Sequence, residues 1–131
     1  MTKNLISPEH DSALKHVTGK ATYTDDILEP KNLLHAAIGY SKISSGKIIK
    51  IDFTEVLNSK GVIDIITDKD IEGNNEVGPV FKGDPIFTSK KIEYHGQPIF
   101  AVAATSYKLA KIAASKVKIK FKETKPILSI K

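Results

Sequence analysis

The stretch IEYHGQPIFAVAATSYKLAKIAASKVKIKFKE, residues 92–123, carries the signals that decide the fold. Residues 99–104 are apolar at every position, which is typical of a strand covered on both faces. Gly96 and Pro98 interrupt the alternating segment before it, because glycine accepts positive φ and proline lacks a backbone donor. Apolar side chains then recur at helical spacing, and residues 117–122 return to strict alternation. This order predicts a turn, a buried strand, a helix packed on a sheet and a half-buried strand.

The predicted helix has a start signal and one apolar face. Thr105 or Ser106 is expected to cap it, because either hydroxyl can accept a first-turn N–H. Its buried face is expected to comprise four apolar residues: Leu109, Ile112, Ala113 and Val117. In the strand that follows, Val117, Ile119 and Phe121 are expected to point inward and Lys118, Lys120 and Lys122 outward.

Before this stretch, the sequence predicts further strands at residues 33–40, 47–53 and 62–66, with a short helix at residues 55–57. A strand, helix and strand therefore occur in order twice. The fold class expected is α+β, a mixed sheet with strand–helix–strand units and two main helices. Residues 1–16 lack periodicity and are expected to form an extended N-terminal arm, and residues 17–131 a single domain. Residues 68–87 exceed the usual loop length, which indicates a functional or interface-forming excursion.

Composition limits the function classes. A chain of 131 residues is one domain's worth, and the absence of cysteine excludes disulfides, thiolate metal sites, iron–sulfur ligation and cysteine nucleophiles. No signal peptide and no membrane-length apolar run is present, so the expected location is cytoplasmic. The net charge is +5, yet all twenty basic residues are lysine. Arginine is favoured for bidentate contacts to bases and phosphates, so a solvated lysine face is expected rather than a nucleic-acid site.

No convincing active site is found in the sequence. Residues 68–73 resemble the start of a calcium loop, but the twelfth position, which needs a bidentate glutamate, is Pro79. Asp25 and Asp26 are adjacent and are expected to cap or to pair with lysine. The histidines stand in separate segments without ligand spacing: His10, His16, His35 and His95. The sequence therefore predicts no catalytic, cofactor-binding or metal-binding residue in this chain.

Five segments resemble the N-terminal region of the large subunit in the xanthine dehydrogenase and aldehyde oxidase family of molybdenum hydroxylases. They are HVTGKATYTDDI (16–27), NLLHAAIGYSKISSGKIIKIDFTEV (32–56), GVIDIITDKDIEG (61–73), NNEVGPVFKGDPIF (74–87) and YHGQPIFAVAATS (94–106). Each is weak alone, but together they keep the family's order and spacing. Around the last helix the family usually has acidic residues or arginine, where this chain has Ser106, Lys108 and Lys111.

The resemblance implies an α/β hammerhead domain that serves as scaffold and interface. It implies that the pterin-binding loops and the glutamate general base lie beyond Lys131, so this chain alone is expected to be inactive. The complete enzyme would hydroxylate a purine such as hypoxanthine or xanthine at a molybdenum–pterin cofactor. Its expected partners are the remainder of the large subunit and a subunit or domain carrying FAD and iron–sulfur clusters, with no nucleic acid and no membrane. The alternative is a free-standing binding or interaction module with the same fold.

Overall fold

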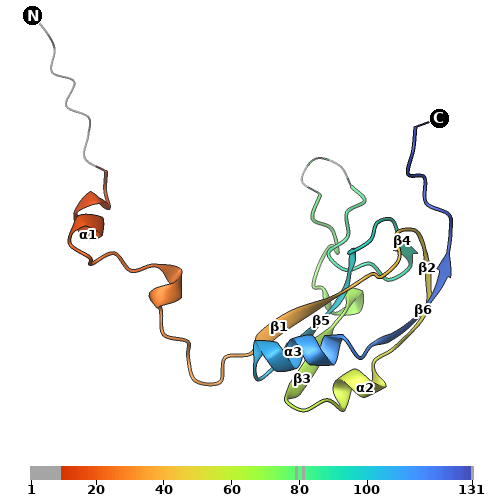
Figure 1. Ribbon diagram of the computed structural model, residues 1–131, viewed down its shortest axis with the longest axis horizontal. Coiled ribbons are helices and arrows are strands. Elements are labelled where there is room, and N and C mark those ends of the chain that lie inside the picture. The colour runs from red at the N-terminus through yellow and green to blue at the C-terminus, as the bar shows by residue number, and fades with distance from the viewer. Residues whose placement is uncertain (1–9, 79, 81, 131) are drawn as a thin grey trace, which may run out of the picture. The chain divides into compact units, whose positions relative to one another are not determined.

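The computed structural model describes residues 10–78, 80 and 82–130, and the chain divides into two compact units, residues 1–31 and 32–131 (Figure 1). In the first unit, α1 spans Ala13–Val17 and the 3₁₀ helix η1 spans Thr24–Asp26. Neither element buries a residue. The N-terminal arm predicted for residues 1–16 lies partly outside the described residues. From residue 10 onward that part of the chain includes most of a short helix.

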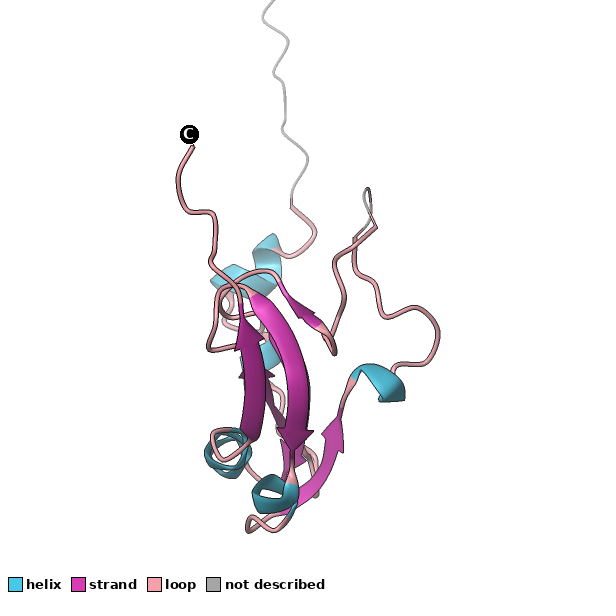
Figure 2. Ribbon diagram, turned by 90° about the vertical axis from the view of Figure 1, so that its right-hand side faces the viewer, coloured by secondary structure: helices cyan, strands magenta, loops and turns pink. Residues whose placement is uncertain are grey.

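The described residues of the second unit form six strands in two three-stranded sheets. Sheet A has the order β1 (His35–Tyr40), β5 (Pro98–Ala104) and β3 (Val62–Ile66). Sheet B has the order β4 (Lys91–Ile92), β2 (Gly46–Asp52) and β6 (Lys118–Glu123). Its helices are α2 (Thr54–Leu57), α3 (Tyr107–Ala114) and the 3₁₀ helix η2 (Asp68–Asp70). Figure 2 shows the long, curved β2 running beside β6, as their register requires.

The α+β hammerhead class is confirmed, whereas the expectation of a mixed sheet is wrong. All four strand pairings within the described residues are antiparallel. A strand–helix–strand unit suggests a parallel crossover because it usually returns to the same sheet. Here α2 leads from β2 of sheet B to β3 of sheet A, and α3 leads from β5 of sheet A to β6 of sheet B. The helices therefore connect two sheets, and the strands alternate between sheet A and sheet B along the whole unit.

The core lies around β5 and α3. Along β5, Ile99–Val102 and Ala104 are buried, which confirms the predicted doubly covered strand. Figure 1 shows α3 lying over β1 and β5. Ser106 caps α3, its hydroxyl accepting the Leu109 N–H at 3.3 Å. Across the core, the Phe53 and Phe100 rings pack in a T-shaped arrangement, with centroids 5.0 Å apart. The sequence signals of the central strand and of the helix start are thus both realised.

The buried face of α3 is made of alanines. Ala110, Ala113 and Ala114 are buried, whereas Ile112, predicted to be inside, is 45% exposed. Small side chains let the helix backbone approach the sheet closely, so the face is set by size rather than by hydrophobicity. On the strand below, a Cβ added to Gly39 would lie 2.1 Å from the Phe100 ring. Close packing of the helix, β1 and β5 therefore depends on residues with little or no side chain.

The second compact unit begins at Asn32, and the single domain expected over residues 17–131 stays a prediction. Within the part of the chain that the structure describes, no helix combines the length and the apolar character that crossing a membrane requires.

Candidate functional site

The histidines singled out in the sequence have separate local surroundings. In the first unit, His10 Nδ1 accepts the Ser12 N–H at 3.2 Å, and the His16 ring nitrogen lies 2.8 Å from the Tyr23 hydroxyl. In the second unit, His35 is half-buried at the start of β1, and His95 is exposed in the turn before β5. Among residues 10–78, 80 and 82–130, no group of three His, Asp or Glu side chains converges as a metal site.

The carboxylates of interest stabilise turns. The Asp26 carboxylate accepts the Tyr23 N–H at 2.9 Å, which is the capping role expected for the Asp25–Asp26 pair. Asp70, in the segment that resembled a calcium loop, accepts the Thr67 N–H and hydroxyl, each at 2.8 Å. These bonds from Thr67 lower the pKa of Asp70 below 3.8. The Asp26 and Asp70 carboxylates therefore each cap the start of a short 3₁₀ helix.

The irregular excursion is tied at its base by Asn75. The Asn75 amide donates to the Phe87 carbonyl at 2.7 Å and accepts the Phe87 N–H at 3.0 Å. These two hydrogen bonds resemble those between paired strands. They hold the buried Phe87 in place at the base of the excursion. Beyond it, Val77 remains 55% exposed. The excursion thus presents apolar side chains from an anchored base.

The turn before β5 depends on a residue that sequence reasoning missed. Gln97 is 1% exposed, and its side-chain oxygen accepts the Glu93 N–H at 2.9 Å. Its backbone carbonyl accepts the Ser41 N–H at 2.8 Å, while Gly96, at φ +85°, donates to the Ser41 carbonyl at 3.0 Å. The positive φ of Gly96 confirms the predicted turn. A buried glutamine has no periodic signal, so only its position between Gly96 and Pro98 could have indicated the role.

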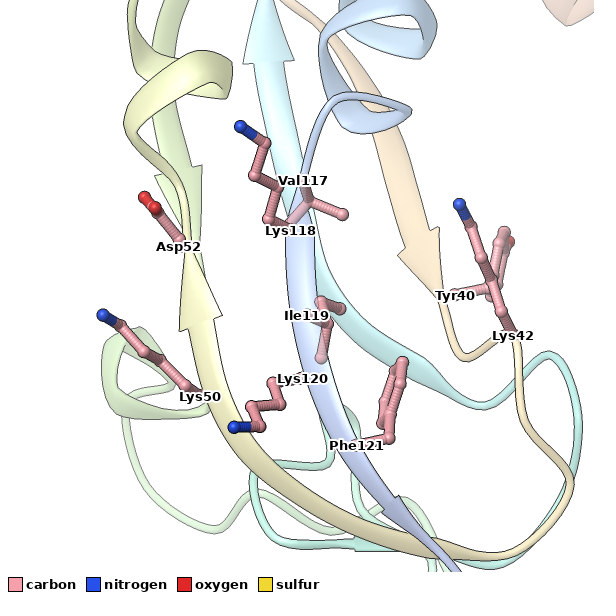
Figure 3. A pocket seen from close by; sticks show the side chains of 9 residues that line it. All are labelled: Tyr40, Lys42, Lys50, Asp52, Val117, Lys118, Ile119, Lys120 and Phe121. Atoms are coloured by element: carbon pink, nitrogen blue, oxygen red, sulfur yellow. The ribbon is translucent and has the colours of Figure 1, made fainter.

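One hollow among the described residues of the second unit runs along β6. Its volume is about 480 Å³, and nine residues line it: Tyr40, Lys42, Lys50, Asp52, Val117, Lys118, Ile119, Lys120 and Phe121 (Figure 3). Lys118 and Lys120 extend to one side of β6, while Val117, Ile119 and Phe121 extend to the other. A second hollow of about 390 Å³ shares Tyr40, Lys42 and Val117 with it and extends towards α3. Strand β6 therefore presents lysines to one side and apolar side chains to the other, where Tyr40 and Lys42 also lie.

Charge on the basic side is only partly balanced. Lys118 pairs with Glu55 of α2, and this carboxylate raises the pKa of Lys118 above 10.5. Hydrogen bonds from the Thr54 side chain and from its N–H (2.9 Å to Asp52 Oδ1), together with Lys50 and Lys118, lower the pKa of Asp52 below 3.8. The arrangement is suited to binding an anionic group and contains no nucleophile–base pair. The sequence prediction that this chain holds no catalytic residue stays a prediction.

Comparison with known proteins identifies the fold family. Residues 18–125 match the family described as the aldehyde oxidase and xanthine dehydrogenase a/b hammerhead domain. This chain belongs to that family. Its hammerhead domain is 40% identical over 125 residues to xanthine dehydrogenase 1 of Arabidopsis thaliana, covering 95% of this chain and 9% of the relative. It is also 40% identical over 119 residues to aldehyde oxidase 2 of Rattus norvegicus, covering 91% of this chain and 9% of the relative. The chain thus spans about a tenth of the length of these relatives.

Solved structures agree with the assignment of the hammerhead domain. The aldehyde oxidoreductase of Desulfovibrio desulfuricans superposes with a TM-score of 0.78 at 32% identity, covering 91% of this chain and 14% of that one. The aldehyde oxidoreductase of Desulfovibrio gigas gives a TM-score of 0.73 at 35% identity over 88% of this chain and 14% of that one. The family resemblance read from the five sequence segments is therefore confirmed.

Proposed function

We propose that this hammerhead domain is a scaffold and interface element of a molybdenum hydroxylase large subunit. The observation that carries the proposal is the match of residues 18–125 to one domain of proteins about ten times longer. In this proposal the complete enzyme hydroxylates a purine such as hypoxanthine or xanthine. The amino-acid sequence of residues 78–87 and 95–106 resembles that of xanthine dehydrogenases, which supports a purine rather than an aldehyde as the substrate. The predicted cytoplasmic location belongs to the same proposal.

Exposed apolar side chains support the interface role. The first unit leaves Leu14, Val17 and Leu28 at least 74% exposed, and the excursion leaves Val80 at 80%. Large apolar side chains gathered at the surface often mark contact sites for other protein parts. These segments are the ones that a domain embedded in a larger subunit would pack against its neighbours. We therefore assign residues 10–31 and 74–90 to contacts with the remainder of that subunit.

The cofactors of the complete enzyme are assigned to other parts of it. The sequence has no cysteine to ligate iron–sulfur clusters, and no described trio of His, Asp or Glu side chains converges. The described residues offer no such ligand set, so we derive no chemical step from this chain. The molybdenum–pterin cofactor belongs to the remainder of the large subunit. FAD and iron–sulfur clusters belong to a partner subunit or domain.

The first test is the mass of the native protein in its source cells. The peptide IEYHGQPIFAVAATSYK, residues 92–108, serves as the handle in mass spectrometry of size-separated extract. We expect it in a subunit several times larger than 14.3 kDa that co-purifies with molybdenum. A stable species near 14.3 kDa without molybdenum would overturn the proposal and favour a free-standing interaction module.

The second test separates the substrate from the scaffold role. The purified molybdenum-containing species should oxidise hypoxanthine or xanthine in preference to a simple aldehyde, and the 131-residue chain alone should oxidise neither. Preference for the aldehyde would contradict the purine and leave the scaffold role standing. Turnover by the isolated chain would contradict the scaffold role itself.

A further inference from the structure

One edge of strand β6 pairs with no other strand among the described residues. Within the described residues it pairs with β2 alone, as the outermost strand of sheet B. An edge strand presents a row of unpaired backbone donors and acceptors to any extended chain that can lie beside it. The hollow of about 480 Å³ lies along β6 and is bordered across from it by Tyr40 and Lys42. The edge therefore faces an open space rather than another element.

The outer face of β6 carries a surplus of positive charge. Lys120 stands directly opposite Lys50 on β2, and Lys122 stands opposite Lys47. A bulge between Ile48 and Lys50 keeps both β2 lysines on this face. Like charges directly opposite each other destabilise a strand pair, so a neighbouring acidic side chain would relieve the repulsion. No ion pair reaches Lys120 in the part of the chain that the structure describes.

The inner face of β6 differs. Ile119 and Phe121 are half-buried against the core, and the second hollow of about 390 Å³ continues the space beyond Val117 and Tyr40. Because side chains of neighbouring strands stand side by side on the same face, an added strand would place one set beside lysines and the other beside apolar groups. The complementary sequence is one in which acidic and apolar residues alternate.

We propose that the free edge of β6 binds an extended segment of a partner polypeptide in which acidic and apolar residues alternate. The backbone of the segment pairs with β6, its carboxylates lie beside Lys118 and Lys120, and its apolar side chains enter the hollow beside Ile119 and Phe121. This is strand addition to a sheet edge, in which backbone bonds give affinity and alternate side chains give specificity. A second copy of β6 is disfavoured as occupant because its lysines would add further like-charge pairs to those that β6 already makes with β2.

The experiment uses the 131-residue chain and a fluorescein-labelled peptide of alternating glutamate and valine, EVEVEVE. Fluorescence anisotropy should show saturable binding, and hydrogen exchange should show new amide protection confined to β6 (Lys118–Glu123). Two control peptides are a block peptide of the same composition and the lysine analogue KVKVKVK, and neither should compete. Binding of the block peptide with equal affinity, or of single-stranded DNA in its place, would overturn strand addition in favour of a non-selective anion surface.

Variants test the charge. Lys120→Glu should weaken binding of the glutamate peptide about tenfold or more, because a favourable cross-strand pair becomes a repulsive one. Lys108→Glu on the exposed side of α3 makes the same charge change away from the edge and should alter affinity less than about twofold in 0.15 M salt, where distant exposed charges are screened. Equal weakening by both variants would contradict the site.

Backbone pairing is tested with two peptides that are N-methylated at alternate residues, one in each frame. Only one set of N–H groups of an added strand faces β6, so one frame should lose binding and the other should retain it. Retention in both frames would overturn strand addition. Dimerisation of the chain that the peptide reverses would overturn it in favour of a second copy as the occupant.

Discussion

In sheet A the middle strand, β5, is buried along almost its whole length, whereas the middle strand of sheet B, β2, keeps its lysines in solvent. Sheet A is covered by α3, whose buried residues are all alanines. Sheet B exposes a face on which Lys47, Lys50, Lys120 and Lys122 stand opposite one another. Packing against sheet A therefore stabilises the domain, whereas sheet B carries exposed charge and, among the described residues, has an unpaired strand edge at β6.

The largest effect is expected at the contact of α3 with sheet A. Ala113→Asp places an unpaired carboxylate at a position that is 0% exposed, which costs about 3–5 kcal/mol in the free energy of unfolding. Ile112→Asp is the matched control on the exposed side of the same helix and should cost far less. Urea denaturation followed by circular dichroism measures both, and similar midpoints for the two variants would contradict the alanine face.

A smaller loss is expected for Gly39→Ala. The new methyl group would meet the Phe100 ring at 2.1 Å, so the ring or the strand must move, at about 1–3 kcal/mol. Ala36→Val adds atoms on the exposed side of the same strand and should leave the thermal midpoint nearly unchanged. A Gly39→Ala variant as stable as the parent would show that sheet A has more room than its packing indicates.

In sheet B we expect a substitution that increases the free energy of unfolding instead of lowering it. Lys120→Glu replaces a like-charge pair with Lys50 by an opposite-charge pair and should stabilise the fold by about 0.5 kcal/mol in low salt. The gain should shrink in 1 M salt because exposed charges are screened there. Thermal unfolding at the two salt concentrations tests this. Destabilisation in low salt would mean that Lys120 already has a partner.

The smallest effect concerns pH. Because Thr54 lowers the pKa of Asp52 below 3.8, the stability that the Asp52 carboxylate contributes is complete above pH 3.8 and is lost as the pH falls through the folded pKa. Thr54→Val should move that pKa upward, and Thr67→Val should leave it unchanged. Carboxyl NMR titration measures both, and an Asp52 pKa that does not respond to Thr54→Val would assign the shift to the Thr54 backbone N–H and the neighbouring lysines instead.

Sequence alone predicted most of the elements. The apolar run of β5, the serine cap of α3 and the alternation of β6 each have one local cause, and each is present in the structure. The mixed sheet failed because sheet membership is decided by contacts far apart in the chain. The prediction that Ile112 is buried was wrong because the helix packs closely on the sheet through the smaller Ala110, Ala113 and Ala114. The role of Gln97 and the hollow beside β6 depend on several segments meeting, which no local pattern encodes.

The alternation of strands between the two sheets has a consequence for how the chain folds. Among the described residues, strands β1, β2 and β3 pair only with β4, β5 and β6, so the described part of residues 32–90 contains three strands and no strand pair. No hairpin of consecutive strands can form early. Every backbone hydrogen bond between strands of either sheet requires a long loop to close first. Such non-local topologies fold slowly. During synthesis, the first half of this domain emerges with its apolar strands unpaired until β4 and β5 have followed.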